Sequence, residues 1–439
     1  MAGGVWTSQN KVRPGVYINF RSVGEAPAVI GERGTVIMAL PLSWGPSKEI
    51  MTIEAAETAT LESVLGYDIT AEPVRLIREA LKRARTLLLY RLNTGTAATA
   101  TSGALTATAK YSGVRGNDIT ITVQESLDNE DQFEVRTMVG GVEKDKQIAA
   151  TIAELKPNNW VKWTGTGALT ATAGVPLTGG GDGTVTNAEH ADFQVAAELQ
   201  AWNTMAYVGT DITLKSVYAA YIKRLRDNEG FKSQLVLENY RQADYEGVIS
   251  VKNGVILEDG TTITAAQATA WVAGATAGAA VNESLTYQAY DGAVDVATRY
   301  TGAQIVAALQ AGEFLFTAKS GRAIVEQDIN TFTSFEAEKD RVFSKNRPIR
   351  TLDGFANDVS RIGEERYIGK VDNNDSGRSL LWKDVVKQAA AYQEIGAFQN
   401  FASEDFKVFA GEEIESVYTE GYVQTTDSTE KMYFLIRNR

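Results

Sequence analysis

The 439-residue sequence has no cysteine and a single histidine, His190. These absences exclude disulfides, thiolate metal sites and cysteine nucleophiles, and one histidine cannot build a multi-histidine metal cluster. The least polar stretch, residues 264–281, consists mainly of small residues and lacks the large aliphatic content of a membrane helix. Residues 1–10 lack the pattern of a secretory signal. We therefore expect a soluble protein from a reducing compartment, with no cofactor and no metal.

Basic residues are also scarce relative to acidic ones. The chain has 43 Lys and Arg against 55 Asp and Glu, a formal net charge of -12. This balance disfavours nonspecific binding to nucleic acid or to an anionic membrane, because both require a cationic face. Hydrophobic residues make up 44% and charged residues 22%, which is typical of globular proteins. The length predicts about three domains.

Helical and strand patterns alternate over most of the chain, which predicts an α/β layer. A buried strand is expected over 34–40, and others over 86–92, 206–208 and 233–237. Helices are expected from Pro73, whose apolar stripe ends at Ala84, and over 188–202, 211–228 and 264–281. Asn253-Gly254 predicts the turn of a hairpin over 248–257. Gly274 and Gly278, four residues apart, indicate close backbone packing of the last helix.

Residues 94–184 differ from their surroundings in being rich in Thr, Gly and Ala. The heptapeptide Gly-Ala-Leu-Thr-Ala-Thr-Ala occurs at 103–109 and again at 167–173. Two copies are too few for a solenoid. We interpret them as two similar edge strands of a small inserted β domain, and the glycine run 179–183 as its flexible return linker.

Extended segments are expected at both ends of the chain. Val16, Ile18 and Phe20 alternate with Tyr17 and Asn19, which predicts a strand after Pro14. The last third predicts a hairpin of 314–317 with 323–329, then helices over 348–367 and 378–395, then strands over 414–425 and 431–436. The protein thus combines an α/β middle with β-rich arms at both termini.

None of the chemical motifs in the sequence is complete. His190, next to Glu189 and Asp192, is interpreted as a solvated residue in the first turn of a helix. The glycine run lacks the GK[ST] ending of a phosphate loop, and Asp372–Gly377 lacks the final Glu of a calcium loop. Lys383 and Lys387 lie four apart on a helix, with Arg378 near its start, and could form either a solvated face or a basic docking stripe. We expect no enzymatic activity.

Six segments resemble, in order, those of contractile phage tail sheath proteins, in particular the sheaths of Gram-positive myophages, their defective prophages and R-type bacteriocins. No single motif decides the resemblance, but their common order along the chain is specific. The segments are 10–20 (NKVRPGVYINF), 113–118 (GVRGND), 270–274 (AWVAG), 325–332 (VEQDINTF), 343–347 (FSKNR) and 367–371 (YIGKV).

The resemblance implies a multidomain α/β and β fold with a central α/β layer of subtilisin-like fold. Because no protease nucleophile segment is present, that likeness concerns the fold and implies no protease activity. The expected division is an N-terminal strand arm (1–22), a central domain (23–93 and 185–330), an inserted outer β domain (94–184), and a C-terminal α+β domain with terminal donated strands (331–439).

The resemblance also implies that the subunit polymerises as stacked hexameric rings around a tail tube and contracts to drive the tube through a target envelope. The implied partners are neighbouring sheath subunits by strand exchange, the tail tube protein, and the baseplate and tail terminator proteins, with neither nucleic acid nor direct membrane insertion. The particle would be a phage tail or bacteriocin assembled in the host cytoplasm. Two alternatives are a virion decoration or adhesin that binds through the inserted β domain, and an enzyme with an acidic pair.

Specific residues are assigned to these contacts by the resemblance. Arg378, Lys383 and Lys387 are expected to face the tube. The strand arms between subunits are expected to comprise Val16, Tyr17, Ile18, Phe20, Val417, Tyr418, Tyr422, Met432, Tyr433, Phe434, Leu435 and Ile436.

Overall fold

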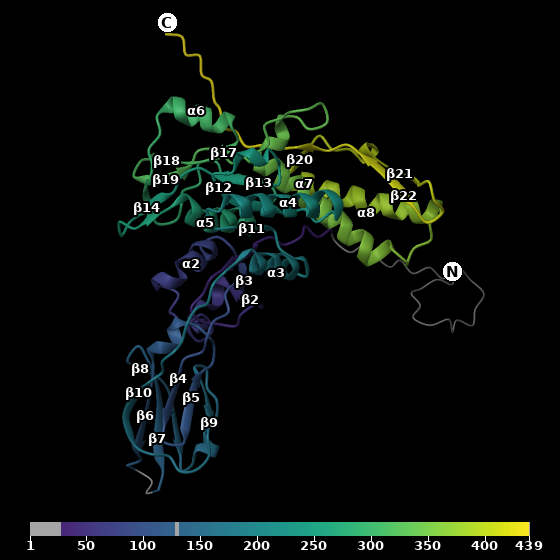
Figure 1. Cartoon of the computed structure of the whole chain (residues 1–439). Coiled ribbons are helices and arrows are strands. Elements are labelled where there is room, and N and C mark those ends of the chain that lie inside the picture. The colour runs from purple at the N-terminus through teal and green to yellow at the C-terminus, as the bar shows by residue number, and fades with distance from the viewer. Residues whose placement is uncertain (1–27, 128–130, 439) are drawn as a thin grey trace, which may run out of the picture.

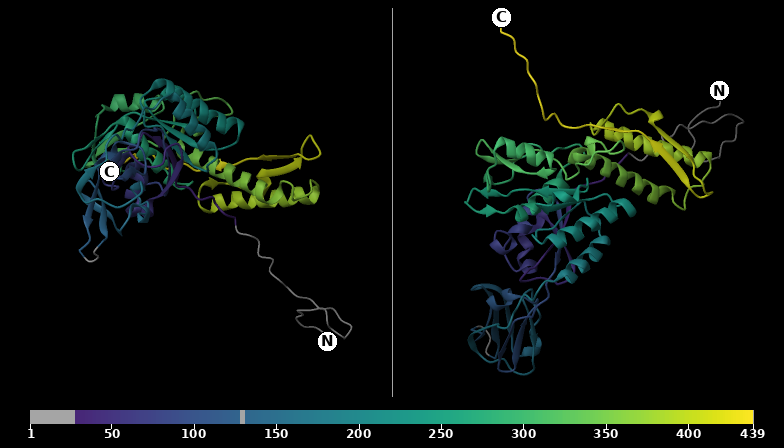
Figure 2. Two further views of the ribbon diagram at one scale, coloured as in Figure 1. Left: turned by 60° about the horizontal axis from the view of Figure 1, so that its bottom comes forward. Right: turned by 45° about the horizontal axis from the view of Figure 1, so that its top comes forward.

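A computed structural model describes residues 28–127 and 131–438 (Figure 1). An α/β body occupies the middle of the molecule. A small β domain extends from one side of the body, and a pair of long helices with a β-hairpin extends from another (Figures 1 and 2). The chain is therefore a mixed α/β protein with several separate sheets, as the sequence predicts.

The body is built on a seven-stranded sheet. Every neighbouring pair is parallel except β2 and β3, which are antiparallel. The strands are short apolar runs, because a parallel sheet is covered on both faces. Their order is β17 (Glu313–Phe314), β13 (Val248–Val251), β12 (Gln234–Glu238), β11 (Thr204–Ala206), β1 (Thr35–Leu40), β3 (Thr86–Arg91) and β2 (Ile50–Glu54).

Alternate side chains of each strand point to opposite faces, and each face has its own apolar core. Val36 and Met38 of β1 pack in the core formed with α2 (Arg75–Leu81) and α5 (Ala265–Gly278). Ile37 points the other way, into the core formed with α3 (Asn187–Glu198) and α4 (Ile212–Asn228). The helices and buried strands expected in this region are therefore confirmed, with ends shifted by a few residues.

The two glycines of α5 lie where the helix crosses α2. A Cβ at Gly274 would lie 2.2 Å from the carbonyl oxygen of Ala80, and one at Gly278 would lie 2.1 Å from that of Arg83. No side chain larger than hydrogen fits at such distances. The close backbone packing predicted from the spacing of these glycines is confirmed.

The hairpin predicted around Asn253-Gly254 is wrong. Val248–Val251 pairs in parallel within the large sheet, whereas β14 (Val255–Leu257) belongs to another sheet with β15 (Thr262–Ile263) and β16 (Ala293–Val296). The side chain of Asn253 explains the change of sheet. Its Oδ1 accepts from the backbone N–H of Phe316 (2.9 Å) and its Nδ2 donates to the carbonyl of Phe316 (2.9 Å). Asn253 thus binds the start of β18 (Phe316–Lys319), which forms the predicted hairpin with β19 (Arg322–Val325).

Two sheets form the inserted β domain and enclose its core. One has the order β10-β6-β7-β8 and the other β4-β5-β9. The strands are β4 (Thr99–Ser102), β5 (Leu105–Ala109), β6 (Ile119–Glu125), β7 (Phe133–Val139), β8 (Val142–Ala149), β9 (Val161–Thr164) and β10 (Thr172–Pro176).

The two heptapeptide copies do not play equivalent parts. The first forms β5, the central strand of its sheet, so its assignment as an edge strand is wrong. The second precedes and begins β10, which is at an edge of the other sheet. The identical segments differ because β9 pairs with the first copy only. The glycine run after β10 is also bonded to the chain: Gly181 bridges Thr96, and the Gly180 N–H donates to Asn117 Oδ1 (2.9 Å).

The C-terminal region consists of two long helices and short strands. Helix α7 (Asn346–Ile362) continues as a π-helical turn (Gly363–Tyr367), and α8 (Asp375–Glu394) follows the polar loop, capped by Asn374. The strands form two separate pairs, β20 (Phe398–Gln399) with β23 (Gln424–Thr425) and β21 (Phe406–Ala410) with β22 (Val417–Gly421). The short helices α1 (Glu62–Leu65) and α6 (Gly302–Gln310) belong to the body.

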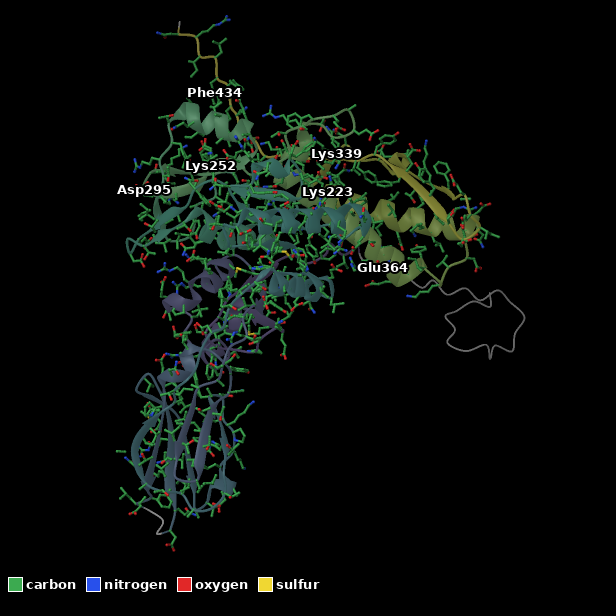
Figure 3. All side chains as sticks on the ribbon, in the orientation of Figure 1. Lys223, Lys252, Asp295, Lys339, Glu364 and Phe434 are labelled. Carbon is green, nitrogen blue, oxygen red and sulfur yellow. The ribbon has the colours of Figure 1, made fainter. Side chains whose placement is uncertain are left out.

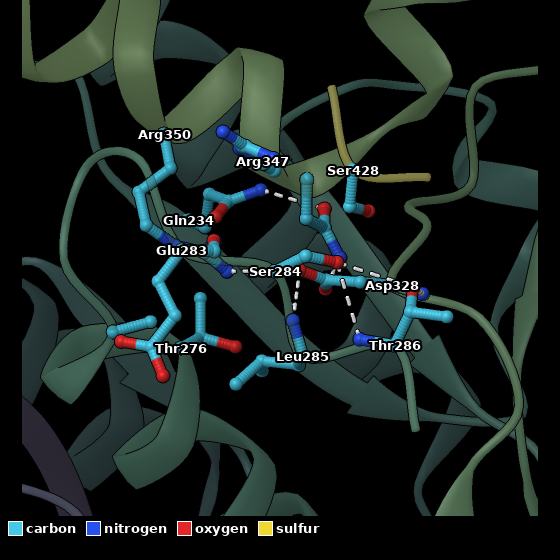
Figure 4. A network of polar contacts seen from close by, with 12 residues as sticks. Gln234, Thr276, Glu283, Ser284, Leu285, Thr286, Asp328, Arg347, Arg350 and Ser428 are labelled. Atoms are coloured by element: carbon cyan, nitrogen blue, oxygen red, sulfur yellow. Dashed lines mark hydrogen bonds and ion pairs between the residues drawn. The ribbon is translucent and has the colours of Figure 1, made fainter. Parts of the chain in front are cut away.

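Helix α7 is joined to the body by buried charge. Arg226 of α4 donates two hydrogen bonds to Asp353 (2.6 and 2.9 Å), and Arg350 pairs with Asp328 (3.3 Å). Asn346 donates to the same Asp328 (2.9 Å). Figure 4 shows Asp328 and Arg350 in the polar network around this carboxylate. Breaking a buried ion pair by removing one partner typically destabilises a protein by about 3–5 kcal/mol. The base of the C-terminal region is therefore firmly attached.

Candidate assembly interface

The described part of the C-terminal arm, residues 431–438, leaves the body as an extended segment next to α6 (Figure 1). The strand predicted over 431–436 is not formed within this chain, because no other strand of the described chain lies beside it. Phe434 lies on this extended segment (Figure 3). The arm carries five consecutive apolar side chains, each exposed by between 68% and 89%: Met432, Tyr433, Phe434, Leu435 and Ile436.

A run of exposed large apolar side chains is unusual on a soluble surface and marks a site of contact or aggregation. The arm nevertheless begins at a firmly held position. Glu430 pairs with Lys345, accepts from Gln327 Nε2 (2.5 Å) and accepts from the Thr286 hydroxyl (2.9 Å). Burial alone would raise the pKa of Glu430, but the hydrogen bonds and charge from these partners hold it below its usual value. We call this contact the arm root.

The hairpin β21–β22 is the second exposed element of the C-terminal region. Phe406, at the start of β21, is buried against α8, and its carbonyl accepts from Trp382 Nε1 (2.9 Å). Among the described residues, each strand of the hairpin pairs only with the other, which leaves both outer edges without a partner strand. An unpaired edge offers backbone hydrogen bonds to another chain.

The predicted contact residues in this region are exposed. Val417 (39%) and Tyr418 (58%) lie on β22, where Tyr418 pairs with Phe409 and stacks on its ring (6.2 Å between centroids). Tyr422 (70%) follows the strand, and its backbone N–H donates to Asp405 (3.1 Å). The predicted residues Val16, Tyr17, Ile18 and Phe20 lie outside the described residues.

Arg378, Lys383 and Lys387 do not form one continuous stripe. Arg378 and Lys383 are five residues apart, which separates them by about 140° around a helix axis. Arg378 bonds Asn373 (2.8 Å) and Asp375 (2.5 Å) at the β21 side of α8. Lys383 is exposed, whereas Lys387 is half-buried near Val29. The structure therefore brings the two lysines together and separates them from the arginine.

His190 is buried, so its interpretation as a solvated residue is wrong. Its Nδ1 lies 2.8 Å from the hydroxyl of Tyr218, and the rings of Tyr207 and Tyr218 surround it. Burial lowers the pKa of His190, against the raising effect of Glu189 and Asp211. The local sequence could not reveal this environment, because both tyrosines come from later elements.

Other sequence motifs have structural roles. Asn374 of the polar loop accepts from the Gly377 N–H (2.9 Å) as the cap of α8, and Asn373 donates to the carbonyls of Ile414 and Ser416 (both 2.8 Å). Within residues 28–127 and 131–438, no cluster of three or more His, Asp or Glu side chains could hold a metal ion. No helix of the same residues is long and apolar enough to cross a membrane.

Sequence reasoning did not find the arm root. The partners of Glu430 lie 85, 103 and 144 residues earlier in the chain. No local pattern distinguishes this glutamate from its neighbours, so only the tertiary structure could identify it. An apolar arm fixed at its root and a hairpin with open edges together define a structural subunit that associates with other chains.

Comparison with known proteins identifies the class more closely. Sequence models of four tail sheath regions match successive parts of the chain. They are the tail sheath protein Gp18 domain III N-terminal region (33–92), the phage tail sheath protein β-sandwich domain (93–182), the phage tail sheath protein central domain (183–331) and the phage tail sheath C-terminal domain (338–439).

Individual proteins agree with these matches. The crystal structure of a sheath tail protein from Desulfitobacterium hafniense is 56% identical, with a TM-score of 0.88 over 97% of this chain and 100% of that one. The XkdK protein of the phage-like element PBSX of Bacillus subtilis is 38% identical over 99% of both chains. The contracted helical sheath of the anti-feeding prophage, 12% identical, shares the fold, with a TM-score of 0.56 over 98% of this chain and 100% of that one.

The chain belongs to the phage tail sheath protein family. It is a structural subunit of a tail sheath and hence a component of a virion or a tail-like particle. The family is one of structural tail sheath proteins.

Proposed function

We propose that the subunit assembles as stacked hexameric rings around a tail tube, linked by donated strands, and contracts to drive the tube through a target envelope. The observation that carries this proposal is the C-terminal arm, whose consecutive apolar side chains are exposed while its root is held by Glu430. A segment of this kind is suited to binding a neighbouring subunit.

The proposed acceptor is the hairpin β21–β22 of a neighbouring subunit. Its edges are open, and it exposes Phe409 and Tyr418 next to an acidic loop. The arm (KMYFLIRNR) is basic, with Lys431, Arg437 and Arg439 around its apolar residues. Complementary charges favour correct encounter and register. The acidic residues of the hairpin and its loop are Glu412, Glu413, Glu415 and Glu420.

The expected division into an N-terminal arm (1–22), a central domain (23–93 and 185–330), an inserted outer domain (94–184) and a C-terminal domain (331–439) forms part of the proposal. The proposal also includes a subtilisin-like fold for the central α/β layer. The two separate sheets of the insertion support its treatment as a unit. In this scheme residues 16–20 are a second donated strand.

Contraction would be a change between two packings of the same subunit bodies. The buried pairs Arg226–Asp353 and Arg350–Asp328 support rigid movement of the C-terminal helices with the body. The arms would keep neighbouring subunits connected while the bodies rotate. New contacts between bodies in the contracted lattice would supply the free energy.

The tube protein is the proposed partner of Lys383, Lys387 and Arg378, and the baseplate and terminator proteins are the proposed partners at the ends of the sheath. Lys383 and Lys387 share one side of α8, where Lys383 is exposed and Lys387 is half-buried. Charges near the surface form weak, screened contacts suited to a grip that must be released. Assembly would take place in the host cytoplasm.

Removal of residues 431–439 tests the proposal, with intact chain as the reference and negative-stain electron microscopy as the readout. We expect the truncated protein to remain folded by circular dichroism and to lose tube formation. A variant truncated only after Ile436 retains the apolar residues and serves as the control. Tubes formed by the 431–439 deletion at the intact protein's concentration would contradict strand donation.

A further inference from the structure

A groove opens at the root of the C-terminal arm. Its volume is about 540 Å³, within the range of about 300–1,000 Å³ typical of pockets that bury a drug-sized ligand. It can therefore accept a few large side chains. Glu430 of the arm root and Lys431 of the arm are among its lining residues. Its apolar wall comes from α6 and from the segment after β19, and consists of Val306, Leu309, Ile329, Phe332 and Phe335. We call this the arm groove.

The wall of the arm groove is incompletely covered. Val306 is 55% exposed and Phe335 is 51% exposed. Helix α6 is apolar apart from Gln304 and Gln310, yet Ala308 is its only buried residue. A solvent-exposed helix ordinarily carries polar residues on its outer face. The composition of α6 therefore indicates a surface that becomes covered.

The arm is an exposed apolar segment that begins at this surface. Lys431 already lines the groove, and the five residues that follow can span about 16 Å when extended. Among the described residues, the backbone of 431–438 makes no hydrogen bond that would have to break when the arm moves. Glu430 keeps its three partners in either position of the arm, because the bend occurs after it.

We propose that the arm of an unassembled subunit folds back into the arm groove of its own chain, with Tyr433 and Phe434 against Val306, Leu309 and Phe335. The extended arm seen here is then the form that a neighbour receives. The groove acts as an internal competitor of the neighbouring hairpin: it covers the apolar run before assembly and lowers the fraction of subunits ready to polymerise. This inference rests on the proposed donation of the arm.

Engineered cysteines test the folded-back position directly, because the natural chain contains none. In dilute protein, the pair V306C/F434C should form an intrachain disulfide on mild oxidation. The matched pair V217C/F434C, with its first cysteine on α4 and exposed, should not. The cross-linked subunit should fail to form tubes until the disulfide is reduced. Absence of the V306C/F434C cross-link, or equal cross-linking of both pairs, would overturn the proposal.

A second experiment separates this inference from the proposed function. If the arm is folded back in nine subunits of ten, releasing it raises the competent fraction about tenfold. V306S/F335S, which changes only exposed positions, should therefore lower the critical concentration for tubes by up to about tenfold. An unchanged or higher value would mean that the groove does not retain the arm, or that it binds a second subunit, and would overturn the inference. Normal tubes from the 431–439 deletion would instead overturn the proposed donation.

Discussion

The inserted β domain and the hairpin β21–β22 are both small β structures at the periphery of the molecule, but only the first is complete. The insertion pairs seven strands in two sheets around a core that includes Trp160 and is completed by Trp44 of the body. The hairpin has two strands, packs one end on α8 through Phe406 and exposes most of its other side chains. Two isolated strands are marginal in water, whereas more strands around a core can be stable alone.

Because of this difference, we expect the insertion to contribute to the stability of the subunit and the hairpin to contribute to its assembly. A substitution in the insertion should affect folding there and leave subunit contacts intact. A substitution on the hairpin should barely change folding and should impair association. Substitutions in the buried ion pairs of α7 should likewise affect folding. Substitutions in the C-terminal arm should likewise impair association.

Trp160→Ala should have the largest effect on stability. Trp160 is buried against Trp44 (5.2 Å between ring centroids), and truncating a buried tryptophan costs about 3–5 kcal/mol. We expect urea unfolding and limited proteolysis to show a loosened insertion, while tubes still form. Trp163→Ala, at a half-buried position on β9, is the matched control and should cost less. Loss of tubes by a folded Trp160→Ala protein would place the insertion within the subunit contacts.

Tyr418→Ala should show the opposite pattern. Because its side chain is 58% exposed, we expect the free energy of unfolding to change by less than about 0.5 kcal/mol. Tube formation should require roughly tenfold more protein, equivalent to a loss of about 1.4 kcal/mol per contact. Val195→Ala, at an exposed position on α3 of the body (67%), is the control. Equal critical concentrations for the two variants would remove the hairpin from the interface.

The arm root should depend on pH. Because the pKa of Glu430 is held below its usual value of 4.5, its contribution to the stability of the arm root is complete above about pH 4.5 and is lost as the pH falls through the lowered value. The protection of the backbone amides of residues 426–431 against hydrogen exchange, taken relative to the intrinsic rate at each pH, should therefore fall below that pH in the natural protein. In Glu430→Gln the protection should be low throughout, and Glu420→Gln should behave like the natural protein. A pH-independent root in the natural protein would contradict the assigned anchor.

The smallest effect is expected from charge reversal on α8. Lys383→Glu with Lys387→Glu should weaken co-sedimentation with tail tubes a few-fold and spare tube-free polymers, because exposed ion pairs contribute about 0–1 kcal/mol each. The difference should shrink at high salt. Lys319→Glu with Arg322→Glu, on the β18–β19 hairpin, makes the same change of charge elsewhere. Equal tube binding by both double variants would mean that Lys383 and Lys387 lie on a solvated face of α8 and do not contact the tube.

Local sequence patterns predicted the strands and helices whose apolar side chains are mostly buried. The buried strand over 34–40, the helix over 211–228 and the close-packed glycines of α5 were found because apolar spacing reflects burial directly. The exposure of Met432 to Ile436 could not be found in this way, since an apolar run predicts a buried strand. His190 and Asn253 were misinterpreted because their partners, Tyr218 and Phe316, are distant in sequence.

The absence of thiol and multi-histidine chemistry, the alternation of the α/β body, the separate composition of the insertion and the resemblance to tail sheaths can all be read from the amino-acid sequence. All of these follow from composition or from short-range spacing. Three features depend on the folded chain: which copy of the repeated heptapeptide becomes a central strand, which glutamate anchors the arm, and which apolar surfaces stay uncovered. Those outcomes depend on pairing between distant segments, and an unpaired strand has the same sequence pattern as a paired one.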